Sequence, residues 1–241
     1  IREPVLSMVQ ESDGTIWFGT NGDGLWRYGQ DVWTRFTVED GLPSNRIQVV
    51  RPLSDGSLWV GTPAGAGFLR EDGNWVVYSE REGLPNNFVE DIWLAADGAV
   101  WVGTRGGVGR FGTAGWVHHL NWPGKKDRGG TELVRDEAGT LWAGTASGLY
   151  KLEDNTWQEV EDLRERVRGP FLNFAVDGQG VLWGATSSHV LQFDGQRWNF
   201  IERYGSDRRR GMRSIAAAQK GGVWLVDRSG IYRFDGQKRK T

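Results

Sequence analysis

The sequence predicts an all-β fold, a β-propeller of six four-stranded antiparallel blades, on three observations. The segment from Asp13 to Thr20, DGTIWFGT, recurs in six versions, and its tryptophans are spaced by 42, 42, 41, 41 and 41 residues. A fixed period of this length marks a repeat architecture. Each repeat holds four short apolar runs separated by turn residues, and none sustains the i, i+3, i+4 spacing of an amphipathic helix. The recurring tryptophans are Trp17, Trp59, Trp101, Trp142, Trp183 and Trp224.

The first repeat shows how the four strands are assigned. An apolar run over residues 5–9 predicts the first strand, and Asp13-Gly14 predicts a two-residue turn whose central residues both have φ > 0. Residues 16–20 are rich in strand formers, and residues 25–28 form the third run. The fourth run carries a second recurring tryptophan. This set is Trp33, Trp75, Trp116, Trp157 and Trp198.

Six such blades account for the whole chain as one domain. The expected blade boundaries are 1–42, 43–84, 85–126, 127–167, 168–208 and 209–241. A fragment of a seven-bladed propeller is the alternative, because Arg239 stands where the last blade should have its second tryptophan. A blade has two apolar faces that only its neighbours can bury, so we expect the tryptophans to be core residues. The glycines after them, such as Gly19, should let the next blade's indole approach closely.

The composition of the chain excludes some kinds of site and disfavours some kinds of partner. The 241 residues carry a formal net charge of −2 and no cysteine, which excludes disulfides and thiolate metal sites. No apolar run approaches the roughly 18 residues of a membrane span. A pI near 6.0 and the lack of a base-reading motif disfavour nucleic acid as a partner.

The first two repeats carry a resemblance to a known family. DGTIWFGT with GLWRY, followed by WTRF and DGLPSN, resembles the two-component regulator propeller repeat, and the second repeat matches as DGSLWVGT and EGLPNN. The later repeats keep the tryptophan motif and lose GLP-x-N. The resemblance implies a periplasmic or extracellular sensor region with downstream signalling domains as partners and a glycan as ligand. Sensors of this family usually carry more blades, and this chain has no kinase segment.

The exit loops of blades three to five depart from the repeat and are rich in cations. These loops should share one rim of the scaffold, where guanidinium groups suit a carboxylate, sulfate or phosphate. We therefore expect a small anionic or glycan ligand there, whereas interleaved acidic residues favour plain solvated loops. His189 replaces a turn glycine on the same rim. The other candidates are Lys125, Lys126, Arg128, Arg164, Arg166, Arg168, Arg208, Arg209, Arg210 and Arg213.

A second constellation comes from one equivalent position of the innermost strands. Asp91, Glu132 and Asn173 are oxygen ligands that suit Ca²⁺, and they would make a metal-dependent lyase or lactonase the alternative function. The competing interpretation is a set of polar residues lining a wet channel, with no cofactor. No catalytic Ser/His/Asp or His/Glu spacing is present, so enzymatic activity is left open and disfavoured. A protein-interaction scaffold on the acidic first two blades is a third alternative.

Overall fold

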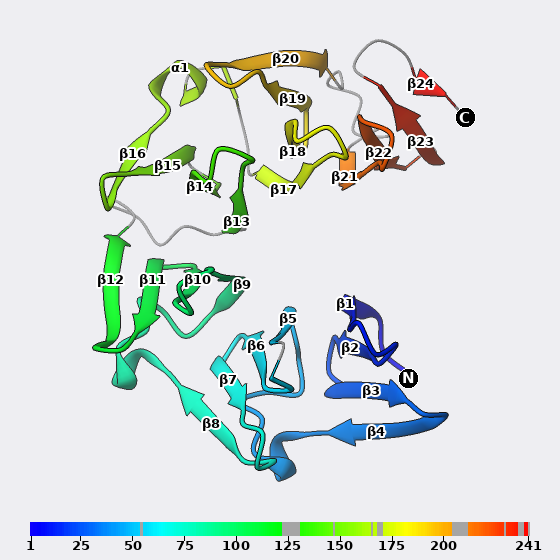
Figure 1. The fold of residues 1–241 in the computed structure, drawn as a ribbon, viewed down its shortest axis with the longest axis vertical. Helices are drawn as coiled ribbons and strands as arrows, with labels where there is room; N and C mark the ends of the chain where they lie inside the picture. Colours follow the sequence, from blue (N-terminus) through cyan, green and yellow to red (C-terminus); the bar gives the residue numbers. More distant parts are fainter. Residues whose placement is uncertain are drawn as a thin grey trace. The chain divides into compact units, whose positions relative to one another are not determined.

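The computed structural model describes residues 1–53, 55–121, 131–146, 148–164, 166–167, 171–203, 212–228, 230–235 and 239–240. These residues form two compact units, Ile1–Lys126 and Asp127–Thr241. Each unit holds three four-stranded antiparallel sheets whose strands follow chain order, as Figure 1 shows. The predicted all-β propeller of six four-stranded blades is therefore confirmed, and the single domain over 1–241 stays a prediction.

The first unit contains blades one to three. Two single turns of 3-10 helix, Val38–Asp40 and Glu80–Glu82, follow the first and second blades. The strands are β1 Val5–Gln10, β2 Ile16–Thr20, β3 Leu25–Gly29, β4 Val32–Phe36, β5 Val49–Pro52, β6 Leu58–Thr62, β7 Gly65–Leu69, β8 Trp75–Tyr78, β9 Val89–Leu94, β10 Val100–Thr104, β11 Gly107–Gly112 and β12 Gly115–Asn121.

The second unit contains blades four to six. A one-turn helix that the sequence did not predict, α1 Glu161–Arg164, follows blade four. The last blade has a fourth strand of two residues, β24 Arg239–Lys240, which pairs with β23. The other strands are β13 Glu132–Arg135, β14 Leu141–Gly144, β15 Leu149–Glu153, β16 Thr156–Glu159, β17 Phe171–Val176, β18 Leu182–Thr186, β19 His189–Phe193, β20 Trp198–Arg203, β21 Met212–Ala217, β22 Val223–Asp227 and β23 Gly230–Phe234.

The Asp-Gly turn between the first two strands differs from the prediction. Gly14 has a positive φ of 88°, as predicted. The φ of Asp13 is not positive, so the prediction that both residues have φ > 0 was wrong. The Asp13 side chain instead accepts the backbone N–H of Thr15 over 2.8 Å, while Gly14 N donates to Glu11 O over 3.1 Å. The aspartate therefore closes an Asx turn within the five-residue connection between β1 and β2, which explains why its position suits a short carboxylate.

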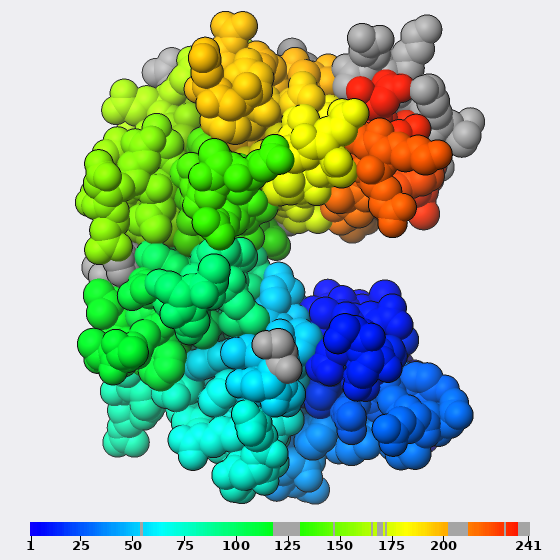
Figure 2. Space-filling view, in the orientation of Figure 1, coloured from blue at the N-terminus to red at the C-terminus, as the bar shows by residue number. Residues whose placement is uncertain are grey.

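The core lies between neighbouring blades of each unit, and Figure 2 shows the first blade, in dark blue, seated against the second. Inner tryptophan Trp17 is buried there against residues of the next blade such as Ile47 and Val50. A Cβ built on Gly19 would lie 2.8 Å from Ile47 Cγ2, and one on Gly144 would lie 2.5 Å from Phe174 Cε2. The glycine therefore admits the innermost strand of the next blade, and the expectation of an indole there was wrong.

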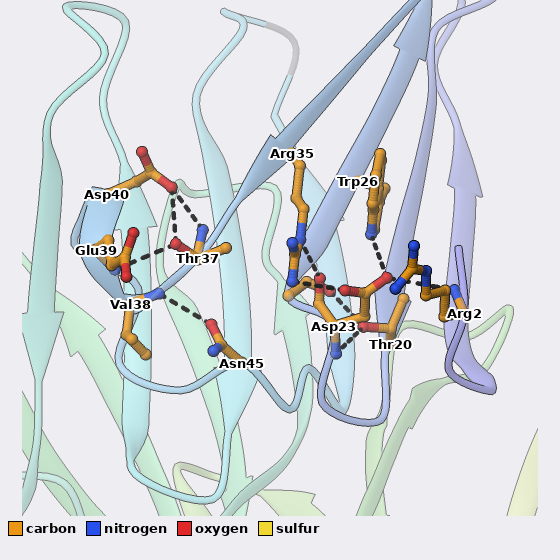
Figure 3. Close-up of polar contacts among 11 residues, drawn as sticks. Arg2, Thr20, Asp23, Trp26, Arg35, Thr37, Val38, Glu39, Asp40 and Asn45 are labelled. Atoms are coloured by element: carbon orange, nitrogen blue, oxygen red, sulfur yellow. Dashed lines mark hydrogen bonds and ion pairs between the residues drawn. The ribbon is translucent and has the colours of Figure 1, made fainter.

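The Gly-Leu-Pro exit loops attach each of the first two blades to the next one. Thr37 caps the 3-10 turn with a capping box, Asn45 Oδ1 accepts the N–H of Val38 over 2.9 Å, and Figure 3 shows both contacts. Gly41 then turns the chain with φ 107°. Leu42 enters the interblade core, and a Cβ on Gly41 would meet Trp75 Cβ at 3.1 Å. Blade two repeats this arrangement with Gly83, Leu84 and Trp116.

Two recurring tryptophans are not core residues, which corrects the expectation that all are. Trp33 is 51% exposed, and Trp224 is 43% exposed. Trp33 lies on the face of the first blade that carries Phe18 and Trp26, opposite the face that packs on the second blade. Burial of a repeat tryptophan thus depends on a neighbouring blade and not on the repeat motif itself.

We expect Gly41→Ala to destabilise the first unit more than Gly14→Ala does. Both glycines have positive φ, so both variants carry the strain of an L-residue in the left-handed region, about 1–2 kcal/mol. Only the Gly41 variant adds a close contact, because a Cβ on Gly14 meets nothing within 4 Å. Urea unfolding of the two variants measures the difference. Equal losses would show that the contact with Trp75 is not tight.

Candidate functional site

The structure describes only part of the predicted cationic rim. Lys125, Lys126, Arg128, Arg168, Arg208, Arg209 and Arg210 lie outside the described residues. The remaining candidates, Arg164, Arg166, His189 and Arg213, all belong to the second unit.

Arg166 and His189 meet on one phenylalanine ring. The guanidinium carbon of Arg166 lies 4.2 Å from the ring centroid of Phe200, which is on β20. The imidazole of His189, the first residue of β19, packs edge-on against the same ring with centroids 5.1 Å apart. Sequence reasoning selected both polar residues and missed Phe200, because its place beneath them depends on how β19 and β20 pair.

Local structure holds the backbone of Arg166 and His189 in place. Leu163 of α1 is buried among Trp142, Phe171 and Trp198, and its carbonyl accepts the N–H groups of Arg166 and Val167 over 3.1 and 2.8 Å. The turn is therefore anchored in the core. His189 is held by its backbone N–H, which donates to Thr186 Oγ1 over 2.9 Å, and its Nδ1 lies 2.9 Å from Ser188 Oγ.

The cations of this rim have weak partners within the described part of the chain. Arg166 lies 3.4 Å from Asp162, and Arg164 lies 3.5 Å from Glu159. Exposed pairs at such distances contribute little to stability, so both guanidinium groups can turn to an arriving anion. Arg213 is exposed on β21, and the described contacts join neither it nor Arg164 to Phe200.

The polar position of the innermost strands makes contacts between blades. Asn173 donates to Ile215 O over 2.8 Å and accepts the N–H of Ile215 over 3.0 Å. Ser7 Oγ likewise accepts the N–H of Val50 over 3.2 Å. These side chains satisfy backbone groups of the next blade, a role that the sequence analysis did not consider.

Two of the three predicted Ca²⁺ ligands, Asp91 and Asn173, form hydrogen bonds with residues of a neighbouring blade. Asp91 Oδ1 accepts from Arg51 Nη2 over 2.8 Å and from the Ile92 N–H over 2.8 Å. Glu132 lies on β13 opposite Gly144, and Asp91 belongs to the other unit. Among the described residues, no group of three or more His, Cys, Asp or Glu side chains could hold a metal ion. Metal binding by Asp91, Glu132 and Asn173 stays a prediction, and the observed partners favour a structural role.

A third set of polar residues was missed by the sequence analysis. Glu11, Asp136 and Asp177 each stand six residues before an inner tryptophan and accept its indole N–H over 2.7, 2.8 and 2.9 Å. Asp177 Oδ2 also accepts the N–H of Gly222 in the next blade over 2.6 Å. An acid at this fixed offset in three of six repeats was the available signal.

Several hydrogen bonds set the ionisation of Asp177. Its burial acts to raise the pKa, but donation by the Trp183 indole and by three backbone N–H groups outweighs burial and holds the pKa below the ordinary value of 3.8. The carboxylate is therefore the form that the folded state prefers.

Residues 2–22 and 41–64 match the family described as "Two component regulator propeller". The match covers the start of the first blade and the passage into the second, and it confirms there the repeat family that the sequence resembles. No curated protein matches the chain.

Solved structures are similar over almost the whole chain. Virginiamycin B lyase from Staphylococcus aureus shares 14% identity at a TM-score of 0.76, covering 99% of this chain and 83% of that one. The extracellular domain of the two component system BT3049 from B. thetaiotaomicron shares 20% at 0.76, covering 98% and 34%. The extracellular domain of the one component system BT4673 shares 18% at 0.73, covering 99% and 36%.

Identities this low establish a common fold and no shared activity. The chain also spans only about a third of the two extracellular domains. In the described part of the chain the one α-helix has four residues, so no described helix is long and apolar enough to cross a membrane.

We expect Asn173→Ala to lower the free energy of unfolding of the second unit by about 1–3 kcal/mol, because it leaves the backbone groups of Ile215 without their partner. Asn199→Ala is the matched control, since that side chain donates to the exposed Asp194 of its own blade over 2.8 Å. Chemical denaturation measures both. A loss no larger than the control's would contradict the interblade role.

We expect the second unit to lose stability as the pH falls below about 4, in part through Asp177. A carboxyl whose pKa is lower in the folded state contributes stability above its unfolded pKa, and this contribution disappears as the pH falls through the folded pKa. Asp177→Asn should be destabilised at pH 7 and should show a shallower acid dependence. Thermal unfolding between pH 2 and 7 tests this, and parallel pH curves for variant and wild type would disprove it.

Proposed function

We propose that this chain is a ligand-binding sensor propeller that recognises an anionic or acidic carbohydrate ligand on the rim of blades three to five. The observation that carries the proposal is the Arg166–Phe200–His189 cluster, in which two nitrogen-rich side chains share one ring. The guanidinium of Arg166 lies over the face of the Phe200 ring. The N–H donors at the edge of the guanidinium can therefore still bond a ligand.

The chemistry of this cluster suits a carboxylate or sulfate on a sugar. A planar guanidinium can donate two parallel hydrogen bonds to such a group, and the imidazole of His189 can donate a further one. The exposure of Arg166, 53% for its side chain, makes it accessible to a ligand in solvent. The chain would bind without changing a bond in its ligand.

The setting of this function follows from the similarity to sensor propellers. Two of the similar structures are extracellular domains of signalling systems, which supports a periplasmic or extracellular location for this chain. The family match supports downstream signalling domains as partners. Binding would act by favouring one arrangement of the propeller and its neighbours, and it can shift that equilibrium only by its difference in affinity for the two states.

We expect Arg166→Ala to weaken the binding of acidic oligosaccharides by about tenfold or more, because it removes a bidentate donor. Arg197→Ala is the matched control, since Arg197 is also exposed in the second unit and contacts Asp194 at its own turn. Calorimetry with a panel of uronate-containing and sulfated oligosaccharides measures the affinities, and circular dichroism confirms the fold.

Two outcomes would overturn the proposal. One is an oligosaccharide that binds the wild type and the Arg166 variant equally well. The other is the absence of binding to every member of the panel.

A further inference from the structure

The place above the inner tryptophan is filled by a planar group in all three blades of the first unit. Arg27 pairs with Trp17 across β2 and β3, and its guanidinium carbon lies 5.7 Å from the ring centroid. Arg110 occupies the same place over Trp101 at 5.8 Å. In the second blade Phe68 stacks on Trp59, with centroids 4.8 Å apart. The electron-rich face of an indole favours such a cation or ring.

Blade four departs from this arrangement. Lys151 pairs with Trp142 in the equivalent register, but its Nζ lies 2.6 Å from Glu153 Oε1. An ammonium group is compact and strongly hydrated, and here it turns to Glu153 instead of lying over the indole. Trp142 is 3% exposed, so only a small part of its indole borders free space. A cavity of about 290 Å³ lies beside Trp142, and Lys151 and Glu153 are among its lining residues.

The cavity lies between blades four and five and has an aromatic wall. Trp142 of β14 contacts Phe193 and Trp198 of the next blade, with centroid separations of 4.9 and 5.5 Å. A second cavity of about 430 Å³ shares Asp136, Ala138, Phe193 and Gly195 with the first. Together the two provide space for a side chain and part of the molecule that bears it.

The charge of this groove favours a cation. Its acidic lining residues outnumber its basic ones, Lys151 and Arg197, by five to two. Lys151 pairs with Glu153, and Arg197 lies 3.6 Å from Asp194, so the charges of each pair cancel. The negative excess therefore comes from Asp136, Glu137 and Asp162. The acidic residues are Asp136, Glu137, Glu153, Asp162 and Asp194.

We propose that the groove between blades four and five binds a guanidinium group, the arginine side chain of a peptide. The bound guanidinium would lie in the cavity beside Trp142, whose paired residue on β15 is Lys151 where other blades have Arg27 and Arg110, and the carboxylates of Asp136 and Glu153 would face it. This site does not depend on the Arg166–Phe200–His189 cluster, and it recognises the opposite charge.

The test uses N-acetyl-arginine amide as the probe, titrated into the ¹⁵N-labelled full chain while indole N–H resonances are followed by NMR. We expect saturable shifts with a Kd on the order of 1 mM, as suits a ligand of this size. N-acetyl-citrulline amide has the same shape without the charge and should bind at least about tenfold more weakly. Equal binding of the two compounds, or no saturable shift, would refute the proposal.

Lys151→Arg is the decisive variant, because it gives blade four the residue that blades one and three have. Its own guanidinium should fill part of the cavity beside Trp142 and weaken the binding of the probe about tenfold or more. Lys220→Arg, the same change at an exposed turn of blade six, should leave binding unchanged.

Glu153→Gln keeps the proposal testable if the arginine variant packs differently. It removes one of the carboxylates that would face the probe, and we expect weaker binding there too. Unchanged binding in both Lys151→Arg and Glu153→Gln would overturn the proposal. Affinity for acidic oligosaccharides should be unaffected in both variants, which separates failure of this site from failure of the rim site.

Discussion

The packing of one blade's inner tryptophan face against the innermost strand of the next blade is the contact on which the described structure depends. Trp17, Trp59 and Trp183 are almost fully buried, and each lies in a cluster that combines residues of two blades. A single four-stranded sheet has no means of covering this face. The glycine two residues after the tryptophan removes the side chain that would hold the next strand away, as the contact of Gly19 with Ile47 shows.

Polar side chains extend this contact at both ends of the inner strands. Asn173 and Ser7 bond the backbone of the next blade near one end, and Asp177 bonds Gly222 near the other. Buried backbone groups must find partners, and a side chain from the neighbouring blade supplies them where strand pairing does not. Residues that would suit a metal ion by type are thus used to hold blades together, which accounts for Asp91 and its partner Arg51.

The candidate sites lie where the repeat is least regular. In the first two blades the residues of the Gly-Leu-Pro exit have structural roles. Leu42 and Leu84 lie in the core, and Asn45 and Asn87 accept backbone N–H groups of the 3-10 turns. In blade four Leu163 keeps the core role with Val167 packed against the same cluster, and the side chains of Arg164 and Arg166 are exposed. The same blade has Lys151 where the three blades of the first unit have arginine or phenylalanine. Loss of the repeat's structural residues and gain of exposed charge therefore coincide.

The number of blades, their four strands and the repeat family can be read from the amino-acid order, because a 41–42-residue period and alternating apolar runs are local features of the chain. The same order marks Arg166 and His189 as unusual for their positions. The folded arrangement was needed to show that both meet Phe200, that Asp91 and Asn173 bond neighbouring blades, and that Trp33 and Trp224 are exposed. These outcomes depend on contacts between residues distant in the chain, and equal spacing in a repeat does not specify which neighbour a side chain will find.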